Sequence, residues 1–260
     1  ACINFREYRS RYDCPDIILN SMKTVFHPSD SRGYANHGWL EVRHSFSFAS
    51  WYQPDRLHFG ALRVLNDDII QGGMGFGTHP HDNMEIVTIP LKGDLEHKDS
   101  MGNSAVIREG DIQVMSAGTG VQHSEYNNSP DKEINLFQLW LFPNKRNVTP
   151  RYDQLPIRSL HRKNEFFQIL SPSADDEGVW IHQDAWMHML DADQGQSFDY
   201  ALQSPEHGVY LIVIEGEVEV DHQILSRRDA IGVWETDKLT IKTKTDAELL
   251  LVQVPMLQLS

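Results

Sequence analysis

The chain has 260 residues, and its 37 acidic residues outnumber its 23 lysines and arginines to give a formal net charge of −14. A surface this acidic repels nucleic-acid phosphates and anionic membranes, so direct nucleic-acid binding and membrane attachment are excluded, and no apolar run approaches the roughly 20 residues of a membrane helix. The length fits one large or two modest domains, and a hydrophobic content of 40% is enough to fill them.

The first 21 residues differ from the rest of the chain. Residues 1–21 are polar and lack clear periodicity, so we expect a leader or tag-like segment. Both cysteines, Cys2 and Cys14, lie within it. The body therefore has no disulfide framework, and a reducing compartment, the cytoplasm, is the expected location.

From Lys23 to Pro143 the pattern is typical of short β-strands separated by turns. Polar and apolar residues alternate around His44, and Asn66-Asp67-Asp68 is a cluster typical of a turn. Strands are predicted at residues 61–65, 85–89, 95–99, 105–107, 112–115 and 134–142. Short strands at this spacing favour a sandwich or a barrel.

Residues 144–172 are polar and contain three prolines, which indicates a linker and the start of a second unit. In each half an apolar strand meets a glycine, Gly93 or Gly216, and a half-exposed alternating strand follows. This self-similarity predicts two related barrels, at residues 22–150 and 151–260. The strands of the second are predicted at residues 210–214, 217–221, 230–234, 239–242 and 249–254.

Two short motifs place histidines two residues from a second donor. His79 and His81 form one pair, and His123 and Glu125 form the other. Side chains at i and i+2 of an extended segment point the same way, so each segment can direct two donors toward one point. The alternative is a set of unrelated surface or core histidines, but the shared spacing and the glycines before both pairs favour a site.

Three imidazoles and one carboxylate suit a transition metal, and cysteines would be expected at a closed structural zinc site. We therefore predict that His79, His81, His123 and Glu125 bind one divalent metal ion. Four protein ligands leave positions open for water, substrate or O2. The donor set alone permits iron, copper, nickel, manganese or zinc.

The sequence around these residues resembles known motifs. Gly73, His79, His81, Glu85 and Gly93 are similar to the first cupin motif, with one extra residue before the last glycine. The second motif, with two extra residues before its histidine, is matched by Gly110, His123 and Asn127. Longer runs resemble the pirin family, namely residues 36–39, 44–48, 77–81, 99–103 and 116–125.

This resemblance implies an all-β bicupin, two packed β-barrels with few short helices, in which only the N-terminal barrel holds metal. The position in the second barrel that matches the histidine pair falls near Ser204, where there is no such pair, and His207 and His222 are isolated. The C-terminal barrel, residues 151–260, is therefore expected to be structural or to cover the first. A monomer is expected, because a bicupin already buries one barrel face against the other.

Several residues receive roles from the same resemblance. In pirins the carboxylate ligand belongs to the second motif, matching Glu125, so Glu85 is expected to be structural or to support the ligands. A supporting role is also expected for His97. His37 and His44 are expected to pack near the domain junction. Three apolar residues are candidates to line the pocket, although a plain core role is favoured for them: Met74, Phe76 and Met115.

Pirins resemble quercetinases, which open flavonols with O2 and release carbon monoxide. The resemblance implies a metal-dependent dioxygenase for a flavonol or a related enol, favours iron, and makes Glu125 the acceptor of the substrate proton. A second hypothesis is a redox-sensing regulatory protein that acts through a protein partner. A third is a metal-binding protein whose natural substrate is unrelated to flavonols.

Overall fold

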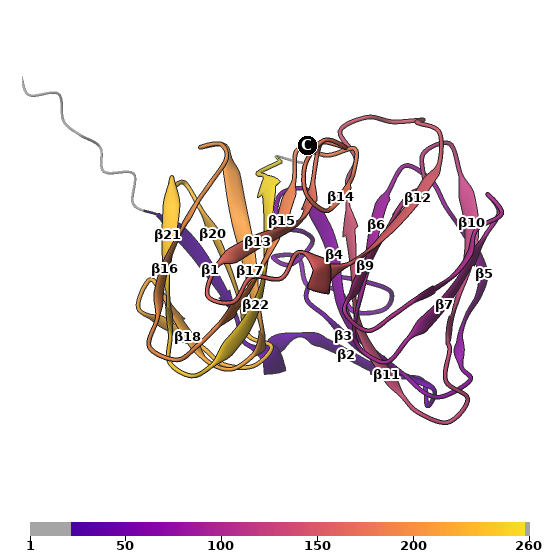
Figure 1. Ribbon diagram of the computed structural model, residues 1–260, viewed down its shortest axis with the longest axis horizontal. Helices are drawn as coiled ribbons and strands as arrows, with labels where there is room; N and C mark the ends of the chain where they lie inside the picture. The colour runs from indigo at the N-terminus through magenta and orange to yellow at the C-terminus, as the bar shows by residue number, and fades with distance from the viewer. Residues whose placement is uncertain (1–21, 258–260) are drawn as a thin grey trace, which may run out of the picture.

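The computed structural model describes residues 22–257, and the leader expected at residues 1–21, with Cys2 and Cys14, lies outside them. It consists of two β-barrels side by side (Figure 1), each built from one seven-stranded and one four-stranded sheet. Short 3-10 helices at Ser29–Ser31 and Ile157–Ser159 are the helices of the described part. The expected all-β bicupin is thus the observed architecture.

The N-terminal barrel encloses the interior that concerns the site. Its seven-stranded sheet has the order β12 (Arg151–Pro156), β9 (Asp111–Ser116), β6 (Glu85–Lys92), β11 (Ile134–Leu141), β4 (Leu62–Ile70), β3 (Leu40–His44) and β2 (Gly33–Asn36). The facing sheet has the order β5 (Gly75–His81), β10 (Val121–Asn127), β7 (Leu95–Asp99) and β8 (Ser104–Ile107).

The C-terminal barrel repeats this arrangement. Its larger sheet has the order β1 (Lys23–His27), β20 (Ala230–Trp234), β17 (His207–Glu215), β22 (Ala247–Pro255), β15 (Trp186–Ala192), β13 (Phe166–Ser171) and β14 (Val179–Trp180). Its smaller sheet has the order β16 (Ser197–Ala201), β21 (Lys238–Thr243), β18 (Val218–Val220) and β19 (Gln223–Leu225).

Two strands cross the boundary that the sequence predicts at residue 150. β1, in the first unit by sequence, pairs with β20 of the C-terminal barrel, from Lys23 opposite Trp234 to His27 opposite Ala230. β12, which follows the boundary, pairs with β9 of the N-terminal barrel. Figure 1 shows β1 in indigo among the orange and yellow strands. Each barrel therefore takes one strand from the sequence range expected for the other.

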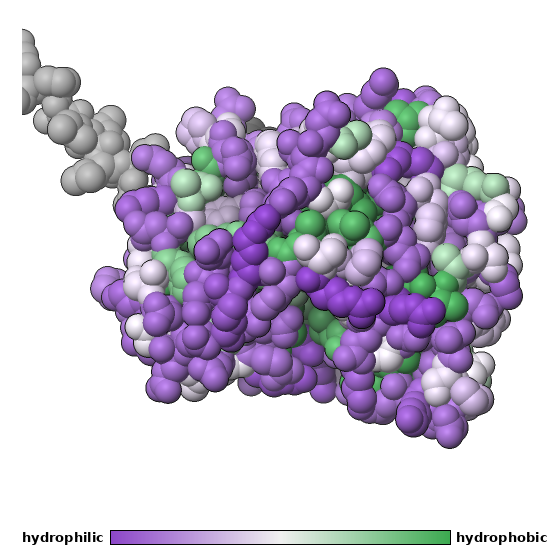
Figure 2. Space-filling model, in the orientation of Figure 1, coloured by the Kyte–Doolittle hydropathy of each residue, from purple (hydrophilic) through white to green (hydrophobic). Residues whose placement is uncertain are grey.

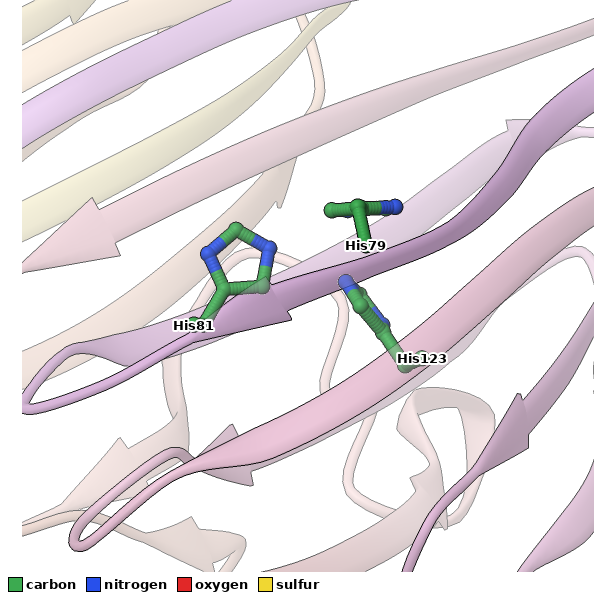
Figure 3. A group of neighbouring side chains, drawn as sticks. All are labelled: His79, His81 and His123. Atoms are coloured by element: carbon green, nitrogen blue, oxygen red, sulfur yellow. The ribbon is translucent and has the colours of Figure 1, made fainter.

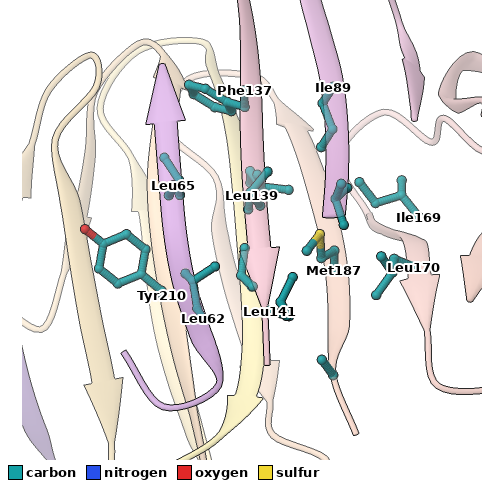
Figure 4. Packing of buried hydrophobic residues seen from close by; sticks show 14 of the residues in the cluster. Leu62, Leu65, Ile89, Phe137, Leu139, Leu141, Ile169, Leu170, Met187 and Tyr210 are labelled. Carbon is teal, nitrogen blue, oxygen red and sulfur yellow. The ribbon is translucent and has the colours of Figure 1, made fainter. Parts of the chain in front are cut away.

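The main hydrophobic core lies between the two seven-stranded sheets. Leu139 and Phe137 of β11 are fully buried there, in the same cluster as Met187 of β15 and Tyr210 of β17 (Figure 4). This packing comes from the face of each sheet that points away from its own barrel interior. Burial of so much apolar surface in one shared cluster fixes the two barrels relative to each other.

The two barrel interiors are filled differently. The C-terminal interior holds a continuous apolar cluster that includes Leu211, Val218 and Ile241. The N-terminal interior holds two smaller clusters, one around Leu95 and Ile134 and one of Ile86, Met115, Ala117 and Val121. Polar residues and open space lie in the N-terminal barrel, which is where a small molecule can enter.

The predicted turn at Asn66-Asp67-Asp68 is wrong. β4 continues through all three residues to Ile70, and all three side chains are buried. Since side chains alternate along a strand, Asn66 and Asp68 point into the N-terminal barrel and Asp67 points toward the other barrel. The alternation around His44 also ends sooner than expected, since β3 stops at His44 and Phe48 makes only an isolated bridge to Trp51.

The surface agrees with the composition. Figure 2 shows a face that is mostly hydrophilic, with apolar residues in view chiefly along the middle of the molecule. Among the described residues, no helix has the length and apolar character needed to cross a membrane.

Candidate metal centre

Two neighbouring antiparallel strands bring three histidines together. His79 of β5 is the direct partner of His123 of β10, and His81 lies two residues further along β5. Their ligand atoms lie within 4.8 Å of one another, and the ring centroids are 4.4 to 4.9 Å apart. Figure 3 shows the three rings close together where the two strands run next to each other. The structure thus joins the two motifs as the sequence predicts.

The nitrogens of these histidines are available for a ligand. Nδ1 of His79 lies 2.8 Å from the carbonyl oxygen of Gly77 and can donate a hydrogen bond to it. The proton is then on Nδ1, so Nε2 has a lone pair free to bind a ligand. Both ring nitrogens of His123 are buried without a hydrogen-bond partner among the described residues. Such buried nitrogens are costly unless something binds them. A metal ion fits this requirement.

Burial also keeps His81 and His123 neutral. It lowers the pKa of His123 to about 3, with a further lowering from His79 and His97. It lowers the pKa of His81 to about 4, with a further lowering from His123 and His79. Neutral imidazole is the form that binds metal, so His81 and His123 do not have to lose protons before they bind a metal ion at neutral pH.

Glu125 lies beside the cluster but not within the same group of donors. It forms a second group with His97 and His123, whose ligand atoms are also within 4.8 Å of one another, so His123 belongs to both groups. The pairing of β10 with β5 has a register shift between His123 and Glu125, at the point where the two donor groups meet. The predicted four-residue set is therefore brought into one region, with His123 in the middle.

The Glu125 carboxylate is held from the opposite sheet. The amide of Gln138 donates to its Oε2 at 3.0 Å, and the hydroxyl of Thr88 lies 3.5 Å from its Oε1. The indole of Trp140 donates to Oε1 of Gln138 at 3.2 Å, which orients the amide. The ring of Trp140 also meets that of His81 edge-on at 4.9 Å. These contacts restrict how Glu125 can turn.

His97, expected to have a supporting role, is fully buried behind the cluster. Its Nε2 lies 2.9 Å from Oδ2 of Asp99, and its ring packs against Tyr152 of β12 at 4.8 Å. Nδ1 of His97 is buried without a partner in the described part of the chain. The Asp99 carboxylate fixes the proton of His97 on Nε2, so Nδ1 carries a lone pair that can accept a hydrogen bond or bind a metal ion.

A cavity of about 540 Å³ lies in front of His79, His81 and Glu125. Phe76 lines the cavity, although a core role was favoured for it, and Met115 has the favoured core role in a separate buried cluster. Met74 is exposed and does neither. The walls of the cavity are mainly aromatic and aliphatic, with contributions from Trp39, Leu40, Val42, Phe48, Trp51 and Trp140. Such a lining suits a flat, largely apolar ligand.

His37 and His44 line this cavity and do not lie at the domain junction where they were expected. Nδ1 of His44 is 2.8 Å from Oδ1 of Asn66, and burial lowers the pKa of His44. His44 and Asn66 continue a polar row across the sheet to Gln138 and Thr88, because each is the register partner of the next. His44, Asn66 and Gln138 of this row line the cavity and give it a polar side opposite the aromatic wall.

Asp68 is the cavity residue that the sequence interpretation missed. Its side chain is fully buried, it lines the cavity, and its Oδ1 has no partner among the described residues. Burial raises its pKa well above the ordinary value of 3.8, with further contributions from Asp67 and Glu125. The available signal was a carboxylate between Val64-Leu65 and Ile69-Ile70, which is an unusual place for one. Gln138 gives a similar signal, because it is a polar residue between Phe137 and Leu139.

Glu85 and the histidines of the second barrel lie outside the two donor groups found among the described residues. Glu85 accepts a 2.7 Å hydrogen bond from Ser116. Burial raises its pKa to about 7, although the hydrogen bond from Ser116 acts to lower it. In the C-terminal barrel His207 is 2.9 Å from the amide of Gln253, and the isolated His222 is exposed.

Two cupin barrels, of which the first carries converging histidines beside a cavity, define a bicupin with a candidate metal centre. Comparison with family models agrees with this class. Residues 25–141 match the model described as Pirin, and residues 168–254 match the quercetinase C-terminal cupin domain. The chain belongs to the pirin family.

Similar proteins extend over most of the chain. Quercetin 2,3-dioxygenase of Escherichia coli K12 is 40% identical over 227 residues, which are 87% of this chain and 96% of that protein. A putative quercetin 2,3-dioxygenase of Pseudomonas aeruginosa is 41% identical and covers 87% of this chain and 97% of its own length. The structure of bacterial pirin YhhW from Escherichia coli in complex with nickel(II) has a TM-score of 0.86 and 38% identity, covering 90% of this chain and all of that one.

Proposed function

We propose that this chain is a metal-dependent dioxygenase of quercetinase type, which opens a flavonol or related enol with O2 and releases carbon monoxide. The observation that carries the proposal is the convergence of His79, His81 and His123 beside a cavity of about 540 Å³. Pockets for small organic ligands measure roughly 300–1,000 Å³. The relatives named quercetin 2,3-dioxygenase support the same reaction.

One divalent transition metal ion would be held by His79, His81, His123 and Glu125. Imidazole and carboxylate ligands suit iron and nickel alike. We favour iron from the family resemblance, while the nickel(II) complex of the related YhhW supports nickel as a second candidate. When bound, the metal supplies the Lewis-acid and redox chemistry that lets an enol react with O2.

The residues of the chain perform the binding and proton steps. Glu125 accepts the proton of the substrate hydroxyl, and Gln138 and Thr88 keep its carboxylate in place while it does so. The aromatic wall that includes Trp140 and Phe76 covers the flat rings and excludes water from the reactive centre. His44 and Asn66 offer polar contacts to substrate hydroxyls at the far side.

The test is the reaction of the iron- and nickel-loaded protein with quercetin, followed by oxygen consumption, loss of quercetin absorbance and carbon monoxide release. Glu125→Gln removes the proton acceptor and is expected to lower kcat by about 10² or more. Glu165→Gln is the matched control, because Glu165 is exposed on the other barrel. If no metal form of the wild type consumes oxygen or bleaches quercetin, the proposal is wrong.

A further inference from the structure

A buried ion-pair cluster lies on the face of β4 that points away from the cavity. Nη1 of Arg32 is 3.2 Å from Oδ2 of Asp67, and Nε of Arg228 is 3.4 Å from the same oxygen. Asn135 donates to the other oxygen of Asp67 at 2.8 Å. Arg32 precedes β2, Asp67 belongs to the N-terminal barrel and Arg228 precedes β20, so the cluster connects the two barrels.

The charges of this cluster do not balance. The side chains of Arg32, Asp67 and Arg228 are only 4%, 10% and 6% exposed, so two buried guanidinium groups share the Asp67 carboxylate. Glu215 and Glu248 also act on Arg228, from beyond hydrogen-bond distance. Nη1 of Arg228 is buried and has no hydrogen-bond partner among the residues that the structure describes. Nη2 of Arg228 donates to Oδ1 of Asn135, and the guanidinium group lies over the ring of Phe137, 4.9 Å from its centroid. A buried excess charge of this kind is unfavourable unless a counter-charge joins it.

The geometry leaves room for that counter-charge. A cavity of about 220 Å³ lies at the cluster, and Arg43 and Arg227 reach it in addition to the two buried arginines. The acidic residues that line it are Glu41 and Asp67, so four arginines face two carboxylates. The lining of this cavity is therefore positively charged, although the chain as a whole has a net charge of −14. Arg43 lies 3.6 Å from Glu41, and Arg227 is paired with Glu215, which keeps both at the rim.

We propose that this cavity binds a small oxyanion, a phosphate or a carboxylate group, between the two barrels. Guanidinium groups match the spacing of the oxygens in both classes and bind them through paired, charge-assisted hydrogen bonds. The anion balances the second buried guanidinium and joins residues from before β2, from β3 and from before β20. Its binding stabilises the folded arrangement of both barrels and is independent of the histidine cluster, which lies on the other side of the sheet.

The test is calorimetric titration of the metal-loaded chain with sodium phosphate, and separately with sodium acetate, at constant ionic strength. The arm that gives saturable binding identifies the anion class. Arg228→Gln and Arg43→Gln are expected to weaken binding by about tenfold or more, as for the loss of a charge-assisted contact. Arg43 is a rim residue, so Arg43→Gln keeps the test valid if Arg228→Gln does not fold. Arg162→Gln, which alters an exposed pair with Glu177, is the matched control and should bind as the wild type does.

The melting temperature gives a second measurement, since a ligand that binds only the folded state raises it in a saturable way. The increase should persist in His79→Ala and disappear in Arg228→Gln. The proposal is overturned if neither anion binds saturably. It is also overturned if binding survives in both arginine variants, or if it is lost in His79→Ala, which would assign the anion to the metal centre.

Discussion

The side-chain amide of Gln138 donates a 3.0 Å hydrogen bond to Oε2 of Glu125 across the interior of the N-terminal barrel. Gln138 stands on the seven-stranded sheet and Glu125 on the facing four-stranded sheet, so the contact spans the barrel. Trp140 fixes the orientation of the amide through its own bond to Oε1 of Gln138. A carboxylate held in this way is ready to bind a metal or accept a proton with little rearrangement.

Gln138→Leu removes this contact and keeps the approximate volume of the side chain. We expect turnover or metal affinity to fall by about 10- to 100-fold, as is typical when an outer partner of a metal ligand is lost. Steady-state kinetics and metal titration measure the two effects separately. Gln196→Leu, an exposed substitution of the same type on the C-terminal barrel, should change neither. Unaltered kinetics and affinity in Gln138→Leu would show that the bond has no role in the site.

Asp68→Asn should change the way stability depends on pH. The folded state raises the pKa of Asp68 well above 3.8, so the folded chain keeps a proton that the unfolded chain loses as the pH rises. Ionisation of Asp68 therefore reduces the stability of the wild type above about pH 4, whereas asparagine cannot ionise. Urea unfolding at pH 4, 6 and 8 should show Asp68→Asn gaining stability relative to the wild type as the pH rises above 4, until the folded chain also loses the proton. A difference that does not change with pH contradicts this, and Asp237→Asn is the exposed control.

His27 provides the opposite pH dependence. It is buried beside Tyr210, with Nδ1 2.9 Å from the phenol oxygen, and burial lowers its pKa from 6.5 to about 4. The unfolded chain takes up this proton first as the pH falls, so stability present above pH 6.5 is lost toward pH 4. Between pH 7.5 and pH 5 the contribution is about 2 kcal/mol.

The His27→Gln variant measures that contribution. Its free energy of unfolding should fall by about 2 kcal/mol less than that of the wild type between the two pH values. Other buried histidines contribute equally to both proteins, so the comparison isolates His27. The exposed His222→Gln should show the wild-type fall. An equal fall in His27→Gln and the wild type would mean that His27 is not held neutral by the fold.

The fold class and the centre of the site were predictable because both depend on short-range patterns. Two donors at i and i+2 need only an extended strand to point the same way, and His79 and His81 do so on β5. His123 joins them because β10 pairs with β5, which the cupin resemblance implied. The local periodicity of apolar residues was enough to predict most strands.

The errors arose where tertiary packing overrides local preference. Asn66, Asp67 and Asp68 are typical of a turn, but the barrel buries them in β4, where Asp67 pairs with arginines and Asn66 with His44. No local pattern identifies the partner of a charged residue from a distant segment. The exchange of β1 and β12 between the barrels is equally invisible, because strand pairing at long range leaves no periodicity in sequence.

The central claim is tested most directly by measuring metal content and oxygen uptake together, for the wild type, His79→Ala and the exposed control His222→Ala. Our account predicts about one divalent metal ion per chain in the wild type and the control, with oxygen consumed in step with quercetin. His79→Ala removes one of the four proposed ligands, so the variant should bind the metal more weakly and lose turnover in the same step. Equal metal content and turnover in all three proteins would contradict the account, as would a wild type that takes up no metal on reconstitution.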